Sequence, residues 1–214
     1  MKKILVCLVW LVGLTGFAPD VVHAKPTLLV LGDSLSAEYG LARDTGWVKL
    51  LEARLAQESL DYRVVNASIS GETTAGGRSR LPALLSEWRP AVVVIELGAN
   101  DGLRGLPLSS MESNLREMAQ AARKSGAKVL IVGTRLPPNY GRELGARFHA
   151  VFARVAKDSD AAVAPFILEG FAEDLAYFQA DRIHPTQSAQ SRMLANVWPH
   201  LRPLLQPARS GKKA

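Results

Sequence analysis

Short apolar runs alternate along the chain with longer stretches in which apolar residues recur every three or four positions. The short runs are rich in β-branched and aliphatic side chains, which favour strands. They predict five strands, within 27–32, 62–68, 91–98, 127–134 and 161–168. The longer stretches have the spacing of one helical face. They predict helices at 45–58, 73–88, 109–126, 141–159 and 186–205.

Strands that alternate with helices are typical of a mostly parallel sheet with helices on both faces. The runs at 27–32 and 91–98 are apolar at consecutive positions, as expected for strands that are covered on both sides. We therefore expect an α/β protein of three-layer α/β/α architecture, with a flavodoxin-like five-stranded parallel sheet in an order close to 2-1-3-4-5. Ligands of such folds bind beyond the carboxyl ends of the strands.

The helix at 109–126 has the clearest boundaries in the sequence. Ser109 followed by Glu112 has the pattern of a capping box, and Gly126 favours an end of the helix. The periodicity also predicts which faces are buried. In this helix the buried residues would be Leu115, Met118, Ala119 and Ala122, and in the closing helix Leu194, Val197, Trp198 and Leu201.

The first 24 residues depart from this pattern. Lys2 and Lys3 precede an uncharged apolar run at 4–18, and small or aliphatic residues lead up to Ala24. The run is shorter than the roughly 20 residues that span a bilayer. These features predict a secretory signal peptide over 1–24 with cleavage after Ala24, and hence a periplasmic or secreted protein. An uncleaved membrane anchor is the alternative.

The length of 214 residues suits one domain, which we expect at 25–206, followed by a disordered basic tail at 207–214. Cys7 is the only cysteine and lies in the leader, which excludes a disulfide, a thiolate nucleophile and a cysteine metal site in the mature chain. The net charge of +6 comes from scattered basic residues without a basic-aromatic cluster. Nucleic-acid binding is therefore not expected, whereas weak contact with an anionic membrane surface is possible.

Polar residues follow the predicted strands at the edge where ligands are expected. Ser34 follows the first strand, Gly71 in "SISGET" the second and Asn100 in "GAND" the third, while Asp181 and His184 lie in "DRIHP" before the last helix. The first three strands are neighbours in the expected order, so these residues could converge on one pocket. Taken singly, each has a structural explanation: a helix cap, a tight turn, an Asx-turn and a surface turn.

Their residue types suit acyl transfer. A serine hydroxyl is a poor nucleophile unless a base assists it, and histidine is the natural base near neutral pH. On a turn, Asp181 is near enough to reach Nδ1 of His184, which leaves Nε2 free to accept a proton. Acyl transfer also needs donors for an oxyanion, which the N–H of Gly71 and the Asn100 amide could supply.

In their order along the chain, these blocks resemble the four motifs of the SGNH hydrolases, also called the GDSL esterase/lipase family. The stretches "VVNASISGET", "RLPALL", "ELGANDGLRG" and "RLPPNYG" are similar to the bacterial branch of thioesterase I, lysophospholipase L1 and arylesterase. The resemblance extends from about Pro26 to the last predicted helix. The combination of motifs is far more specific than any one of them.

The resemblance implies that Ser34 is the nucleophile, His184 its base and Asp181 the residue that orients the base. It implies an oxyanion hole made by the N–H groups of Ser34 and Gly71 with the Asn100 side chain, no metal or other cofactor, and a small-molecule substrate that is an acyl ester or thioester. Relatives often have glycine where this chain has Glu38. We expect that difference to affect the loop and the rim of the pocket.

Several alternatives stay open at this point. Loops at 103–108 and 135–144 are rich in leucine and proline and form either an acyl-chain slot or ordinary loop packing. A carbohydrate O-acetyl esterase with the same site, or a non-catalytic periplasmic binding protein, would also fit the fold. His149 and His200 fall in predicted helices and are weaker candidates for a base. The stretch "GETTAGGRS" lacks the lysine of a phosphate-binding loop.

Overall fold

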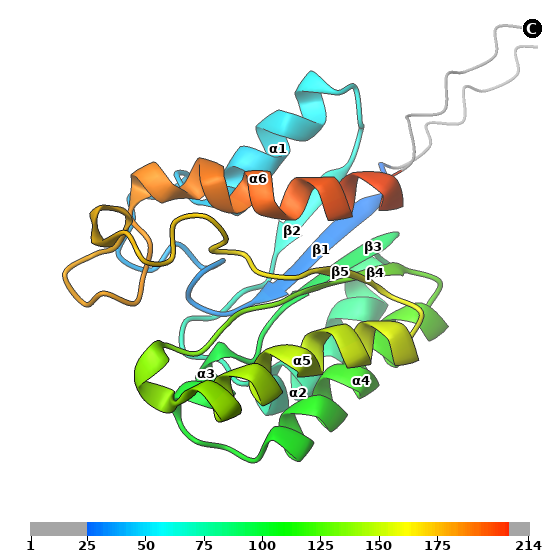
Figure 1. The fold of residues 1–214 in the computed structure, drawn as a ribbon. Coiled ribbons are helices and arrows are strands. Elements are labelled where there is room, and N and C mark those ends of the chain that lie inside the picture. Colours follow the sequence, from blue (N-terminus) through cyan, green and yellow to red (C-terminus); the bar gives the residue numbers. More distant parts are fainter. Residues whose placement is uncertain (1–24, 206–214) are drawn as a thin grey trace, which may run out of the picture.

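A parallel sheet of five strands runs through the middle of the molecule (Figure 1). The computed structural model describes residues 25–205, and the strands follow the order β2-β1-β3-β4-β5. They are β1 (Thr27–Gly32), β2 (Arg63–Asn66), β3 (Val92–Glu96), β4 (Lys128–Val132) and β5 (Ala162–Ala164). The predicted fold class and strand order are therefore confirmed. The signal peptide predicted at 1–24 and the whole tail predicted at 207–214 lie outside the described residues.

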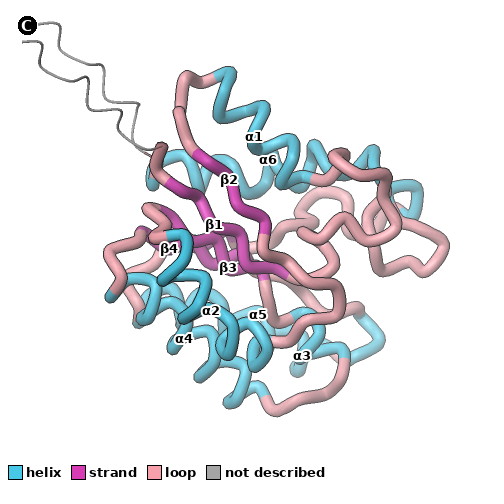
Figure 2. Tube along the Cα trace, turned by 180° about the vertical axis from the view of Figure 1, so that it is seen from behind, coloured by secondary structure: helices cyan, strands magenta, loops and turns pink. Residues whose placement is uncertain are grey.

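Helices cover both faces of the sheet, as Figures 1 and 2 show from opposite sides. One face carries α1 (Trp47–Gln57) and α6 (Gln190–Leu201). The other face carries α2 (Thr74–Trp88), α4 (Leu108–Lys124) and α5 (Arg142–Asp158). A short helix, α3 (Ala99–Leu103), follows β3 and was not predicted. Among residues 25–205, no helix is both long and apolar enough to cross a membrane.

The sheet separates two hydrophobic cores, which explains the continuous apolar runs in the sequence. Leu28 and Val30 of β1 face the core beneath α1 and α6, whereas Leu29 and Leu31 face the core beneath α2, α4 and α5. All four are fully buried. Successive side chains of a strand point to opposite faces, so a strand between two cores must be apolar at every position.

The boundaries of α4 differ in part from the prediction. The predicted capping box is wrong, because α4 begins at Leu108 and Ser109 lies inside the helix. The N-cap residue is Pro107, which makes no side-chain hydrogen bond to the helix, and Glu112 instead pairs with arginines. Gly126 has a φ of +92° just after the helix, in keeping with the predicted end. The four predicted core residues of α4 are all buried.

The buried face of α6 is only partly as predicted. Val197 and Leu201 are buried, whereas Leu194 and Trp198 are half-buried at the margin of the core. The helix begins at Gln190, after a single 3₁₀ turn at Gln187–Ala189, and not at residue 186. Its buried residues therefore also include Gln190 and Met193.

Candidate active site

Ser34 stands at the point where β1 leaves the sheet. The N–H of Leu35 donates to Asp33 Oδ1 at 3.1 Å, and the N–H of Ala37 donates to the Asp33 carbonyl at 2.9 Å. These bonds close a tight turn around the half-buried Ser34. The amide of Asn66, at the end of β2, donates to the Ser36 carbonyl at 2.8 Å and ties the turn to the neighbouring strand.

The hydroxyl of Ser34 faces an imidazole that comes from the other end of the sequence. His184 Nε2 lies 2.9 Å from Ser34 Oγ, and His184 Nδ1 lies 2.6 Å from Asp181 Oδ2. The other oxygen of Asp181 accepts the main-chain N–H groups of Ile183 and His184 at 2.9 and 3.0 Å. Hydroxyl, imidazole and carboxylate thus form one hydrogen-bonded chain.

The charge of Asp181 determines which nitrogen of His184 donates. Burial alone would raise the pKa of the Asp181 carboxyl, but hydrogen bonds from the main chain and ring of His184 and from the main chain of Ile183 lower the pKa to about 2. The carboxylate is therefore ionised near neutral pH and can only accept at Nδ1. A neutral His184 then carries its proton on Nδ1, which leaves Nε2 as an acceptor beside Ser34.

Gly71 and Asn100 come from the ends of the two strands beside β1. Gly71 follows β2 and has a φ of +79°, a backbone conformation that residues other than glycine rarely adopt. Asn100 lies in α3, and its Nδ2 donates to the Glu72 carbonyl at 3.0 Å and to Asp33 Oδ2 at 3.2 Å. Within the described part of the chain, the main-chain N–H groups of Ser34 and Gly71 donate to no protein acceptor.

Two buried carboxyl groups lie beneath this cluster and were not singled out in the sequence. Asp33 and Glu96 are 1% and 2% exposed. Ser36 Oγ donates to Glu96 Oε2 at 2.7 Å, and Trp47 Nε1 donates to Ser36 Oγ at 3.2 Å. Burial raises the pKa of Asp33 to about 6 despite hydrogen bonds that oppose it. Burial and the neighbouring charge of Asp33 raise the pKa of Glu96 well above its usual range. The sequence signal that could have identified these two buried carboxyl groups is their place at the ends of the apolar strands β1 and β3.

This burial predicts a pH-dependent effect of Glu96→Gln on stability. A carboxyl whose pKa is higher in the folded than in the unfolded protein favours folding at low pH, and this contribution is lost as the pH rises through the folded pKa. The glutamine variant has no carboxyl to ionise at this position, so its stability does not fall for this reason as the pH rises. Urea unfolding between pH 5 and pH 8 should therefore show the variant gaining stability relative to the unaltered protein as the pH rises.

The matched control is Glu87→Gln, which makes the same change at an exposed position of α2. The difference in unfolding free energy between Glu87→Gln and the unaltered protein should not change between pH 5 and pH 8. A Glu96→Gln variant whose relative stability stays constant or falls with rising pH would contradict the assignment of Glu96 as a carboxyl that favours its protonated form.

Glu38 lies on the loop that follows Ser34, and its side chain binds the main chain of that same loop. Its φ is +58°, and its carboxylate accepts the main-chain N–H groups of Asp44 at 3.1 Å and Gly46 at 2.6 Å. The side chain therefore orders its own loop up to the start of α1. The left-handed backbone explains why a glycine is easily accommodated at this position.

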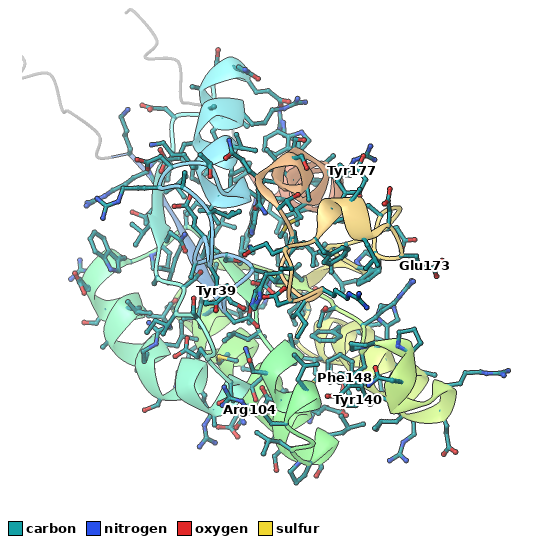
Figure 3. All side chains as sticks on the ribbon, turned by 90° about the vertical axis from the view of Figure 1, so that its left-hand side faces the viewer. Tyr39, Arg104, Tyr140, Phe148, Glu173 and Tyr177 are labelled. Atoms are coloured by element: carbon teal, nitrogen blue, oxygen red, sulfur yellow. The ribbon has the colours of Figure 1, made fainter. Side chains whose placement is uncertain are left out.

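The remaining histidine candidates lie in helices, as predicted, and outside the hydrogen-bonded chain of Ser34, His184 and Asp181. His149 lies in α5 with Nδ1 3.1 Å from the Thr134 carbonyl, and His200 lies in α6. Tyr140 donates to the Leu103 carbonyl at 3.0 Å, which joins the two leucine- and proline-rich loops. Figure 3 looks onto the carboxyl edge of the sheet, with Tyr177 above the level of Tyr39 in this view and Arg104 and Tyr140 below it.

A doubly wound parallel sheet with a serine, a histidine and an aspartate hydrogen-bonded in series at its carboxyl edge is the arrangement of a serine hydrolase of the α/β class. Residues 30–192 match the model of the GDSL-like lipase/acylhydrolase family, and the chain belongs to that family. The predicted family is thus confirmed, and the protein is a carboxylic ester hydrolase.

The relatives support the same family. The chain is 57% identical over 182 residues to esterase TesA of Pseudomonas aeruginosa. The aligned region covers 85% of this chain and 90% of that protein. It is 40% identical over 182 residues to thioesterase 1/protease 1/lysophospholipase L1 of Escherichia coli K12, covering 85% and 86% respectively. A crystal structure of TesA matches with a TM-score of 0.82 and 57% identity over 84% of this chain and 99% of that chain.

Proposed function

We propose that the protein hydrolyses esters and thioesters of acyl chains through an acyl-enzyme on Ser34. The observation that carries the proposal is the chain of two short contacts, 2.9 Å from Ser34 Oγ to His184 Nε2 and 2.6 Å from His184 Nδ1 to Asp181. Both distances are within the reach that proton transfer requires. The names of the relatives, an esterase and a thioesterase/lysophospholipase, support this substrate class.

In the first half of the reaction, Ser34 Oγ attacks the carbonyl carbon while His184 Nε2 takes the hydroxyl proton. The tetrahedral intermediate then collapses, and His184 returns the proton to the departing alcohol or thiol. In the second half, water attacks the Ser34 ester and gives its proton to His184, which passes it to Ser34 Oγ as the acid leaves. Asp181 stays ionised and stabilises the imidazolium in both halves.

The oxyanion would be held by the N–H groups of Ser34 and Gly71 and by the Asn100 amide. The two N–H groups donate to no acceptor within residues 25–205, which supports this assignment. Of the two hydrogen bonds of Asn100, the one to Asp33 is the longer at 3.2 Å. We propose that the oxyanion replaces Asp33 as the acceptor for this N–H.

The rim of the site supports an apolar acyl chain as ligand. Four of the six large hydrophobic side chains that are exposed in residues 25–205 lie on the loops that carry or directly follow the proposed site residues; the other two lie in the first turn of α5 and in a 3₁₀ turn. The six are Tyr39, Ile69, Leu106, Leu144, Leu175 and Ile183. Exposed apolar side chains that gather around a site favour an apolar ligand. We also propose export, on the signal-peptide pattern of residues 1–24.

The test combines an acyl-chain series with a covalent probe. The purified protein is given p-nitrophenyl esters from acetyl to long acyl chains and an acyl thioester, and its serine is labelled with a fluorophosphonate. We expect faster hydrolysis beyond the acetyl ester and a single adduct on Ser34 by mass spectrometry. A steady fall in rate beyond acetyl would indicate an O-acetyl esterase, and no turnover or labelling would indicate a binding protein.

A further inference from the structure

The proposed nucleophile and base sit on different loops, and their short contact depends on how those loops are held together. Asp181 does not do this, because its hydrogen bonds go to Ile183 and His184 of its own loop. It orients the imidazole within that loop. A second group must set the position of the whole loop against the turn that carries Ser34.

Gln179 makes hydrogen bonds to both loops. Its Nε2 donates to the Tyr39 carbonyl on the serine side at 2.8 Å and to the Pro185 carbonyl on the histidine side at 3.1 Å. Its main-chain N–H donates to the His184 carbonyl at 2.8 Å. One residue therefore joins the two segments through three hydrogen bonds next to the proposed base.

The Gln179 amide lies close to the loop that carries Tyr39 and Gly40. The ring of Tyr39 lies against the His184 imidazole, with centroids 4.3 Å apart and planes tilted by 37°. Gly40 has a φ of +69°, and a β-carbon there would lie 2.1 Å from Gln179 Oε1. The amide therefore occupies space that only a glycine at position 40 leaves open.

We propose that Gln179 is a positioning residue, whose amide holds the Tyr39 and Pro185 segments together so that the His184 ring stays in line with Ser34 Oγ. This inference rests on the proposed function, in which Ser34 and His184 exchange a proton. Gln179 reaches neither the hydroxyl nor the imidazole nitrogens with its side chain. It acts through the backbone on both sides of the base, and loss of its amide would let the Ser34–His184 contact lengthen.

The decisive variant is Gln179→Met, which keeps the length of the side chain and removes both donors. A misplacement of reacting groups by about 1 Å can lower turnover by about 100-fold. We expect kcat and the rate of fluorophosphonate labelling to fall about tenfold or more, with KM changed by less than about twofold. If Gln179 only stabilised the fold, its loss would lower the melting temperature, and kcat would not fall while KM stays nearly unchanged.

The matched control is Gln187→Met, the same change at an exposed glutamine eight positions further along the histidine side, for which no side-chain hydrogen bond is found within residues 25–205. Its kcat, KM and labelling rate should equal those of the unaltered protein.

Gly40→Ala tests the same contact from the serine side. Its β-carbon would displace the Gln179 amide, so kcat should fall again, and the double variant with Gln179→Met should lose little more than either single variant. Full kcat in Gln179→Met, or strictly multiplicative losses in the double variant, would overturn the proposal. Failure of the proposed function would look different, because the unaltered protein would then leave Ser34 unlabelled.

Discussion

Ser34→Ala should lower kcat/KM for an acyl ester by about 10⁴- to 10⁶-fold, because removal of a serine nucleophile leaves only the catalysis that binding and oxyanion stabilisation provide. The fold should persist, since Ser34 is half-buried and its turn is closed by main-chain and Asp33 bonds. The measurement is steady-state hydrolysis of a p-nitrophenyl ester, with melting temperature as the check on folding.

His184→Ala should produce a loss of similar size, and the two changes together should cost little more than either alone, because the groups act as a unit. The controls are Ser110→Ala at an exposed position of α4 and His149→Ala in α5, which lies outside the Ser34–His184–Asp181 chain. Both controls should retain near-normal turnover. Esterase activity that survives in purified Ser34→Ala would refute the mechanism.

Asn100→Ala should lower kcat by about 100- to 1,000-fold with a small change in KM, the size of effect expected when one donor to an oxyanion is removed. The donor matters mainly in the transition state, where the carbonyl oxygen becomes an anion. Asn100→Asp provides a stricter test, because it keeps the shape and replaces the donor by an acceptor. Its loss should be at least as large.

The control for Asn100 is Asn196→Ala. Asn196 also donates its amide to two acceptors, the carbonyls of Ile167 and Glu169, both at 3.0 Å. That variant should lose stability and keep kcat. If Asn100→Ala and Asn196→Ala lowered kcat equally, the amide of Asn100 would have to be assigned a structural role instead of an oxyanion contact.

The fold could be predicted in outline because its signal is local. A strand between two cores is apolar at consecutive residues, as Leu28 to Leu31 are, and a helix repeats its apolar positions every three or four residues. The exact ends of the helices, and the presence of very short helices, were less predictable. The start of α4 at Leu108 and the five-residue helix α3 depend on the neighbouring loops, and neither has a periodicity of its own.

The candidate site, like the fold, could be predicted only in part from the sequence. By itself, the sequence determined the family from its motifs and the sheet order from its alternating strands and helices. It also predicted the set Ser34, Gly71, Asn100, Asp181 and His184, because these residues occur in motifs that directly follow or precede regular elements. Their catalytic roles stay a prediction until the variants above are measured.

Only the tertiary structure decided how those residues are supported. The burial of Asp33 beside Glu96 and the hydrogen bond from Gln179 to Tyr39 could not be read from any local pattern. Glutamine and glutamate are ordinary surface residues in a sequence. Their effect here comes from desolvation and from contacts with partners as many as 140 residues away, and these exist only once the sheet has brought the loops together.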